Sequence, residues 1–363
     1  MILSRARTVR TGLLVAAVAA FSAQGAVAAA RTIVVKQHHS IQAAVNKAGR
    51  GGTVVVRPGT YRQALVIRTD GLTLKGPGAV LKRPGRAPKT PCSQIDPSGV
   101  TGICVVGDVT PNGSGPPIVH KSVNRVTISG VTVQGFSGNG ILGFATKNLT
   151  VSHTHLLQNG SYGVFSNTSS GTRYLSNVAR GNHAPGLYIG DSPQARASVI
   201  DNLSVNNAGE GLLARSADFG IVKDNVFTGN CAGILVLADS PGPATNWRVG
   251  DNIVRTNNRA CAGDPAEGEP PLSGIGIALV GAADTHVGRN TVTGNSKGHN
   301  RSPFSGGILV VTLPGGKTAP KRDTVKSNHL SGNRPRDLFW DKTGTARFTG
   351  NHCRTSRPAG LCK

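Results

Sequence analysis

A short motif, glycine followed by an apolar, a variable and a second apolar residue, returns along most of this chain of 363 residues. Its first two positions are Gly140-Ile141, Gly163-Val164, Gly186-Leu187, Gly211-Leu212, Gly233-Ile234, Gly276-Ile277 and Gly307-Ile308. The first four intervals are 23, 23, 25 and 22 residues, and the last two, of 43 and 31, fit the same unit with inserted loops. A repeat of this length is typical of a solenoid, because one unit cannot bury its apolar side chains alone.

Asparagines form a second repeat in phase with the first. Six of them, Asn177, Asn202, Asn225, Asn252, Asn290 and Asn328, are each followed five residues later by another asparagine. Three residues before them stand Tyr174, Val199, Val222, Val249, Val287 and Val325. These apolar columns predict short strands that stack in parallel about 4.8 Å apart, with alternate side chains in the bore. We expect the asparagines at corners, where this residue tolerates left-handed backbone and its amide can bind the next coil.

The beginning of the repeat region has the pattern of a cap. Ser40 is a predicted N-cap for a helix with one apolar face, formed by Ile41, Ala44, Val45 and Ala48, that ends at Gly49. Strand-like runs follow at 53–56, 65–67 and 72–74. A short helix there would cover the exposed strand edges of the first coil.

The same segments resemble a known class of proteins. SIQAAVNKA at 40–48, GTVVVRPGTY at 52–61 and LTLKG at 72–76 resemble the opening of right-handed parallel β-helix proteins of the pectin-lyase-like class. The resemblance covers roughly residues 32–352 and implies an all-β fold, a right-handed parallel β-helix with a short N-terminal capping helix. It implies a polysaccharide partner but no single activity, since the class includes lyases, hydrolases, epimerases, adhesins and metal-centre maturation proteins.

The N-terminal 30 residues predict export. Arg5, Arg7 and Arg10 precede an apolar run at 13–21 and a stretch of small residues, which is the pattern of a secretory signal peptide. We therefore expect residues 1–30 to be removed and residues 31–363 to form a single secreted domain. No later apolar stretch is long enough for a membrane span.

Six cysteines suit an oxidising compartment, where they can pair completely. They fall into three close pairs along the chain: Cys92 with Cys104, Cys231 with Cys261, and Cys353 with Cys362. We expect those three bridges, although fifteen connectivities are formally open to six cysteines.

The charge is strongly positive and lies at the two ends of the chain. Residues 31–90 hold 12 basic and 1 acidic residues, residues 91–316 hold 14 and 13, and residues 317–363 hold 11 and 3. Such ends should attract a polysaccharide or an anionic cell-wall polymer, unless the charge only keeps the protein soluble. Aromatic residues make up 4% of the chain, too few for a nucleic-acid stacking platform, so no nucleic-acid partner is expected. We expect a monomer.

Two functions follow from the resemblance and the charge. One is a polysaccharide lyase that acts by β-elimination on an acidic polymer, since lyases of the class use Arg, Lys, His or Tyr as base and often Ca²⁺. Candidate catalytic residues are His153, Arg173, Arg215 and Arg289. The alternative is a non-catalytic, cell-wall-associated binding or scaffold protein. The near-neutral middle of the chain and the absence of the hydrolase, epimerase and calcium-loop signatures favour the alternative.

A polar column stands just before the first asparagine of each coil. It reads His153, Ser176, Asp201, Asp224, Asp251 and Arg289. Carboxylates on successive coils would lie about 5 Å apart, where two unit charges repel by about 3 kcal/mol at an effective dielectric of 20. Asp201, Asp224 and Asp251 are therefore a candidate Ca²⁺ site, and the simpler interpretation is solvated turn aspartates.

An apolar stripe is predicted on the outward side of the Gly-apolar strands. It comprises Leu142, Phe165, Tyr188, Leu213, Leu235, Ala278 and Leu309. A stripe of this kind is either covered by loops or exposed for binding. The insertions at 257–273 and 296–305 are the expected covers. The alternative is a sugar-stacking groove centred on Phe165 and Tyr188, with Arg173 and Arg215 nearby.

Overall fold

The computed structural model describes residues 30–86, 88–97, 99–112, 115–239, 242–263, 270–299, 301–313, 315 and 318–363. The predicted signal peptide at 1–30 lies, apart from its last residue, outside the described residues. Neither helix in these ranges has the length and apolar character needed to span a bilayer.

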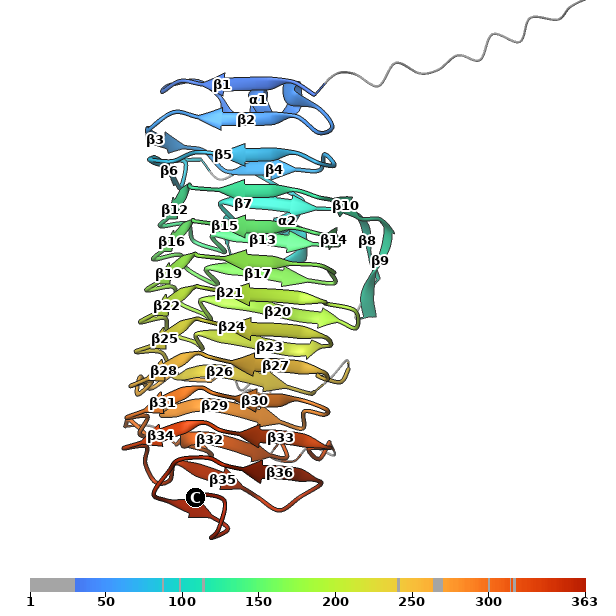
Figure 1. The fold of residues 1–363 in the computed structure, drawn as a ribbon. Helices are drawn as coiled ribbons and strands as arrows, with labels where there is room; N and C mark the ends of the chain where they lie inside the picture. Colours follow the sequence, from blue (N-terminus) through green and yellow to red (C-terminus); the bar gives the residue numbers. More distant parts are fainter. Residues whose placement is uncertain are drawn as a thin grey trace, which may run out of the picture.

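The described chain coils through three long parallel sheets, which run the length of the molecule (Figure 1). Sheet A consists of β1 (Thr32–Val35), β2 (Thr53–Val56), β5 (Thr73–Lys75), β11 (Thr127–Ser129), β15 (Thr150–Ser152), β18 (Arg173–Leu175), β21 (Ala197–Ile200), β24 (Gly220–Lys223), β27 (Trp247–Gly250), β30 (His286–Gly288), β33 (Asp323–Lys326) and β36 (Ala346–Thr349). Sheet B consists of β3 (Gly59–Arg62), β6 (Ala79–Lys82), β12 (Thr132–Gln134), β16 (His155–Leu157), β19 (Val178–Arg180), β22 (Leu203–Val205), β25 (Val226–Thr228), β28 (Ile253–Arg255), β31 (Thr291–Thr293) and β34 (His329–Ser331). Sheet C consists of β4 (Leu65–Ile67), β7 (Ile103–Val106), β13 (Ile141–Phe144), β17 (Val164–Asn167), β20 (Leu187–Ser192), β23 (Leu212–Ala217), β26 (Ala232–Leu237), β29 (Ile275–Val280), β32 (Gly306–Val311), β35 (Leu338–Trp340) and β37 (Ser356–Arg357). The remaining elements are α1 (Ile41–Ala48), α2 (Cys92–Ile95), β8 (Asp108–Asn112), β9 (Gly115–Lys121), β10 (Val123–Asn124) and β14 (Thr146–Lys147).

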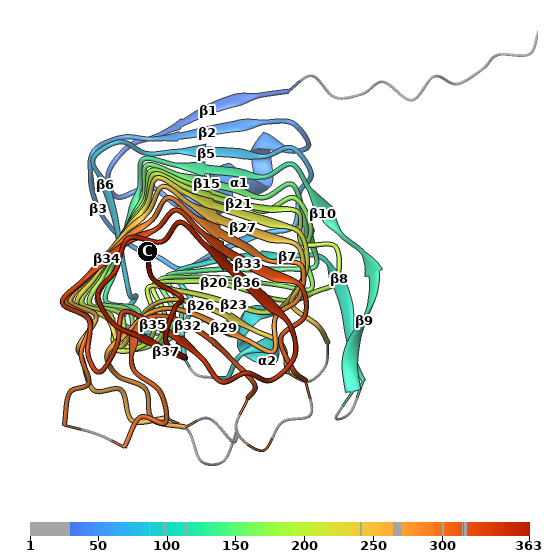
Figure 2. The same cartoon turned by 60° about the horizontal axis from the view of Figure 1, so that its bottom comes forward.

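The strand register confirms the predicted inward columns. In sheet C, Ile141 pairs with Val164, Val164 with Leu187, and Leu187 with Leu212. In sheet A, Val199 pairs with Val222 and is fully buried. Figure 2, an oblique view toward the end of the stack, shows the three sheets arranged around a common interior. The buried apolar side chains of the sheets form one core cluster. The residues some two dozen positions apart are therefore neighbours along the axis.

Two buried asparagine ladders join the coils at the corners. In the first, the backbone N–H and side-chain amide of Asn202 both donate to Oδ1 of Asn225, at 2.8 and 2.9 Å, and Asn225 donates in the same way to Asn252. The second ladder repeats the pattern five residues on, with Asn182 donating to Asn207. Each asparagine thus satisfies backbone groups of its neighbour that would otherwise be buried without partners.

The sequence analysis expected left-handed backbone at the asparagines of the first ladder, but the residue before each of them has it. Asp201, Asp224 and Asp251 have φ of 59°, 57° and 57°. These side chains point away from the bore, whereas the following asparagines are buried. The ladder requires an ordinary backbone at the asparagine, so the strained position falls one residue earlier.

The N-terminal helix caps the first coils as predicted. Ser40 accepts a hydrogen bond from the backbone of Ala43 at 3.1 Å, and the four predicted apolar residues are the buried face of α1. Gly52 packs directly against the helix, where any side chain would collide with the carbonyl of Ala48. In Figure 1, α1 lies at one end of the stack of coils.

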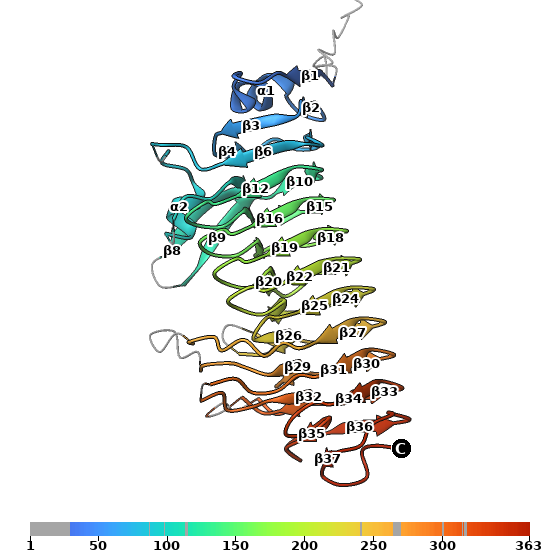
Figure 3. The same cartoon turned by 90° about the vertical axis from the view of Figure 1, so that its left-hand side faces the viewer.

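Two insertions that the sequence did not indicate lie beside the upper coils. The first, between β6 and β7, contains the short helix α2, and the second, between β7 and β10, is the antiparallel hairpin of β8 and β9. Figure 3 shows α2, β8 and β9 on the side of the molecule that carries the inserted loops. Cys92 at the start of α2 is bonded to Cys104 in β7, which holds the first insertion against sheet C.

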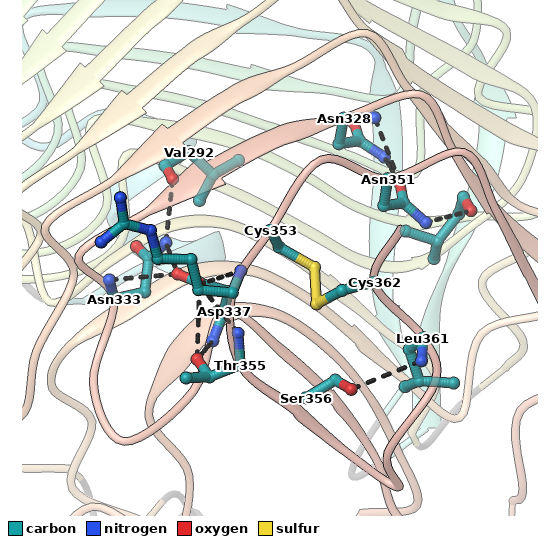
Figure 4. The surroundings of a disulfide bond; sticks show 12 residues. Val292, Asn328, Asn333, Asp337, Asn351, Cys353, Thr355, Ser356, Leu361 and Cys362 are labelled. Atoms are coloured by element: carbon teal, nitrogen blue, oxygen red, sulfur yellow. Dashed lines mark hydrogen bonds between the residues drawn. A yellow bond between two sulfur atoms is a disulfide. The ribbon is translucent and has the colours of Figure 1, made fainter.

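The three expected disulfides are present, with Cα atoms 5.8, 5.7 and 5.2 Å apart in chain order. Figure 4 shows the last, between Cys353 and Cys362, at the C-terminal end of the stack beside Asn351 and Asp337. Asp337 ends the second asparagine ladder, because its Oδ1 accepts from the Nδ2 of Asn333 at 2.9 Å.

Candidate functional site

The apolar stripe is aligned in sheet C and is almost entirely covered. Its members are at most 6% exposed, apart from the half-buried Phe165. Leu272 and Phe304, from the two inserted loops, pack over the coils from β23 onward, which confirms the predicted covers. The insertion around α2 covers the coils near Leu142. Phe165 contacts both apolar clusters, so it marks the junction between the two covers.

Three aromatic rings meet at this junction. The rings of Phe165 and Tyr188 stack with centroids 4.5 Å apart and planes 7° apart. Tyr162 lies 5.0 Å from Phe165 and 5.1 Å from Tyr188. Tyr188 is only 3% exposed, so the predicted open stacking surface is not present: the rings stack on each other, and the edges of Phe165 and Tyr162 remain partly accessible.

A polar cluster follows the rings at the carboxyl ends of β17, β20, β23 and β26. Asn167 donates from Nδ2 to Oδ2 of Asp191 at 2.7 Å. On the next coils, Nε of Arg215 lies 2.8 Å from Oδ2 of Asp239, and the hydroxyl of Ser216 donates to its Oδ1 at 2.9 Å. One arginine and two carboxylates are thereby collected on consecutive coils.

Tyr188 and the neighbouring Asp191 favour their neutral forms more strongly than they would in water. Burial raises the pKa of the Tyr188 phenol well above its ordinary value, and the nearby Asp191 carboxylate adds to this. Burial also raises the pKa of Asp191, against the lowering effects of Asn167 and Arg215. Oδ1 of Asp191 is buried without a hydrogen-bond partner in the described structure. Such perturbed groups are characteristic of functional sites.

Because Gly190 has no side chain, the Tyr188 ring can lie along β20 toward the polar cluster at Asp191. The two residues are on the same side of β20, and a side chain at 190 would collide with the phenol oxygen and ring of Tyr188. The phenol oxygen is thereby placed over Gly190, immediately before Asp191.

A pocket of about 510 Å³ adjoins the rings beneath the inserted loops. Its floor is the outward face of sheet C, with Leu213 and Leu235, and Tyr162 stands at its edge. Glu210 and Arg259 are the charged residues of its described lining. Glu210 is 7% exposed, so this pocket pairs a mostly apolar wall with a buried carboxyl group.

Of the predicted site residues, the structure brings together Phe165, Tyr188 and Arg215. Arg173 lies elsewhere: it is in β18 of sheet A, paired with Thr150 and Ser198, and the expectation that it flanks the rings is wrong. Inward residues of the two sheets share the core, but their outward residues face different sides of the solenoid (Figure 2).

The polar corner column lies where each coil turns from sheet A to sheet B, whereas the aromatic rings lie on sheet C. His153 is exposed, with φ of 52°. Asp201 accepts from the hydroxyl of Ser176 at 2.8 Å, and Asp224 lies 3.2 Å from Nζ of Lys223.

Asp251 and Arg289, also in this column, form a two-point ion pair at 2.8 and 2.7 Å, and the hydrogen bonds from Arg289 lower the pKa of Asp251. Within the part of the chain that the structure describes, no three side chains from His, Cys, Asp and Glu gather where they could hold a metal ion. Asp224 and Asp251 are paired with Lys223 and Arg289 of the protein itself.

Sequence reasoning missed Tyr162, Asp191 and Asp239. The carboxylates stand at different offsets from the repeat glycine, five residues after Gly186 and six after Gly233. They therefore form no sequence column, and only the coil geometry brings them to one edge. The usable signal was their position at or just after the end of an extended sheet C strand.

Comparison with known proteins agrees with the fold. Residues 94–246 match a family model described as a right-handed β-helix region. No curated protein matches the sequence. The A-module of a mannuronan C-5 epimerase from Azotobacter vinelandii is similar in structure, with a TM-score of 0.58, 18% identity, and coverage of 87% of this chain and 91% of that chain.

Two further solved structures are similar over most of this chain. The Dettilon tailspike protein has a TM-score of 0.56 at 12% identity, covering 90% of this chain and 68% of its own. A family 28 exopolygalacturonase from Yersinia enterocolitica has a TM-score of 0.54 at 14% identity, covering 90% and 76%. At these identities the likeness concerns the fold. The chain has a right-handed parallel β-helix fold.

Proposed function

We propose that this protein is exported and cleaves an acidic polysaccharide by β-elimination at the outward face of sheet C. The observation that supports this proposal is the collection of Tyr188, Asp191 and Arg215 on adjacent coils, beside aromatic rings. Solved proteins of similar fold include a mannuronan epimerase and an exopolygalacturonase, whose names describe action on polysaccharides.

β-Elimination needs a cation for the uronate carboxylate, a base for the proton next to it, and an acid for the departing oxygen. Arg215 supplies the positive charge, for which the uronate carboxylate competes with Asp239. Asp191 supplies the base, since burial raises its pKa and so strengthens it as a proton acceptor. Tyr188 stays protonated and supplies the acid.

In this reaction Asp191 takes the proton from the carbon next to the carboxylate. The electrons of that C–H bond form a carbon–carbon double bond, and the glycosidic C–O bond on the neighbouring carbon breaks. The leaving oxygen takes the phenol proton of Tyr188. Proton return from Asp191 to the phenolate through solvent restores both groups, so the cycle consumes no other reactant.

A second candidate function, binding without chemistry, is supported by a groove of about 1070 Å³ on sheet A. Arg196 and Arg248 line it, together with Phe219 and Ile221, which are 41% and 42% exposed. Exposed apolar side chains next to arginines are suited to an acidic sugar chain, as expected for a cell-wall-associated protein.

The test is product formation by the purified mature protein. Polygalacturonate, alginate and hyaluronan are incubated with it, with and without Ca²⁺, and unsaturated uronates are followed by their ultraviolet absorbance. Asp191→Asn should lower the rate about 100-fold or more. Asp201→Asn is the matched control, because both aspartates have positive φ, 44° and 59°, which asparagine tolerates.

Absence of product with every polymer would contradict the lyase proposal. Salt-sensitive retention on isolated cell walls in the same preparation would then favour the second candidate. Mass spectrometry of the secreted chain tests the export proposal, which expects a start near Arg31.

A further inference from the structure

The C-terminal end of the solenoid contains a large basic pocket that the proposed reaction does not use. Its volume is about 1210 Å³. Residues 296–297 and 302–305 form one wall, and the turns on both sides of β35 form the other. Four arginines and one lysine line it: Arg334, Arg336, Arg354, Arg357 and Lys297.

The acidic residue in the described lining of this pocket, Asp337, offsets only one of these five positive charges. Asp337 is 2% exposed, and its Oδ1 accepts from the backbone N–H and the Nδ2 of Asn333. Its Oδ2 accepts from the backbone N–H of Arg354 and from the N–H and hydroxyl of Thr355. Figure 4 shows Asp337 enclosed by these donors. The carboxylate is used in closing the last coil.

The cations of the pocket therefore have little compensation. The structure gives the side chains of the four arginines no hydrogen bond or ion pair within the described ranges, and Nζ of Lys297 donates only to the carbonyl of Ser302 at 3.1 Å. By contrast, Arg215, Arg289 and Arg322 each lie against an aspartate. Like charges gathered in a concave surface attract anions strongly.

Two half-buried aromatic rings select among anions. Phe304 and Phe339 line the same pocket and pack against the apolar cluster on sheet C. A ring at the base of a charged pocket gives a surface for the apolar face of a sugar, while guanidinium groups bind carboxylate or sulfate in two-point contacts. A simple inorganic anion would bind the arginines but make no contact with the aromatic rings.

We propose that this pocket binds a segment of an acidic glycan, through at least two of its anionic groups. It lies five coils from Tyr188, about 24 Å along the axis at 4.8 Å per coil. The site anchors the polymer and does not depend on any reaction at the Tyr188 cluster. Carboxylated and sulfated glycans share the required chemistry, and the experiment separates them.

The test uses the mature protein and three oligosaccharides of equal length: a galacturonate oligomer, a heparin oligomer and a neutral cello-oligomer. Binding is measured by calorimetry at about 150 mM salt. The triple variant Arg334→Gln, Arg354→Gln, Arg357→Gln should weaken binding of the preferred acidic oligomer at least about tenfold. The control triple Arg180→Gln, Arg255→Gln, Arg347→Gln removes the same charge from exposed strand positions and should change it less than about twofold.

A second measurement needs no variant. Arginine modification by phenylglyoxal, read by mass spectrometry, should be slowed at Arg354 and Arg357 by the acidic oligomer and unchanged at the exposed Arg255. Equal losses in the two triple variants, equal protection at all arginines, or equal binding of the neutral oligomer or of a DNA oligonucleotide would each overturn the proposal. These outcomes are independent of catalysis, which the Asp191→Asn rates report separately.

Discussion

Truncating one rung of the asparagine ladder should destabilise the protein far more than removing an exposed asparagine. Oδ1 of Asn225 accepts from the backbone N–H and the amide of Asn202, and its Nδ2 donates to the carbonyl of Val199 at 2.8 Å. The side chain is 1% exposed. Asn225→Ala therefore leaves the buried N–H of Asn202 and the buried carbonyl of Val199 without these partners, and each loss costs about 1 to 3 kcal/mol.

The expected loss is about 3 to 5 kcal/mol in the free energy of unfolding, including the packing of the deleted amide. The assay is urea unfolding of the disulfide-intact protein, followed by circular dichroism. Asn206→Gly is the control, because Asn206 is exposed, has φ of 55°, and glycine accepts that backbone. The control should stay within about 0.5 kcal/mol of the unchanged protein. An Asn225→Ala protein within 1 kcal/mol of the control would refute the ladder's role.

Three further outcomes follow from single contacts. Burial raises the pKa of Asp323 from 3.8 to about 7, so the protonated carboxyl group stabilises the folded protein fully below about pH 4, and this stabilisation is lost as the pH rises through 7. Asp323→Asn should remove up to about 4 kcal/mol of that pH dependence in the free energy of unfolding measured from pH 4 to 8, and an unchanged slope would contradict it. Gly190→Ala should displace the Tyr188 ring and lower the lyase rate at least about tenfold with little change in sheet content by circular dichroism; a normal rate would show that the ring's position is unimportant. Replacing both Cys353 and Cys362 by serine should lower the free energy of unfolding by about 2 to 3 kcal/mol, since the bridge closes a short loop of separation 9, and no change in the urea midpoint would count against it.

The architecture could be predicted because each coil repeats the same burial problem. Val199, Val222 and Val249 must share a column once the coil length is constant, and the register places them so. The asparagine spacing likewise predicts a ladder. The backbone strain at the preceding residue could not be read from these patterns, since aspartate, serine, histidine and arginine all occupy that position.

The candidate site was only partly predictable because insertions and loop offsets break the repeat. Tyr188 and Arg215 belong to regular strands, so their coil positions follow from the repeat. Asp191 lies near the end of β20 and Asp239 just beyond β26, because the strands end at a different offset in each coil. Arg173 was misplaced because neighbouring positions in sequence can belong to different sheets.

The most direct test of the proposed reaction site is a crystal structure of the Asp191→Asn protein with an acidic oligosaccharide bound. The account predicts a uronate carboxylate within hydrogen-bond distance of the Arg215 guanidinium, with its sugar ring beside Phe165 and Tyr162. A well-ordered oligosaccharide found only in the sheet A groove, with the Arg215 region unliganded, would contradict it.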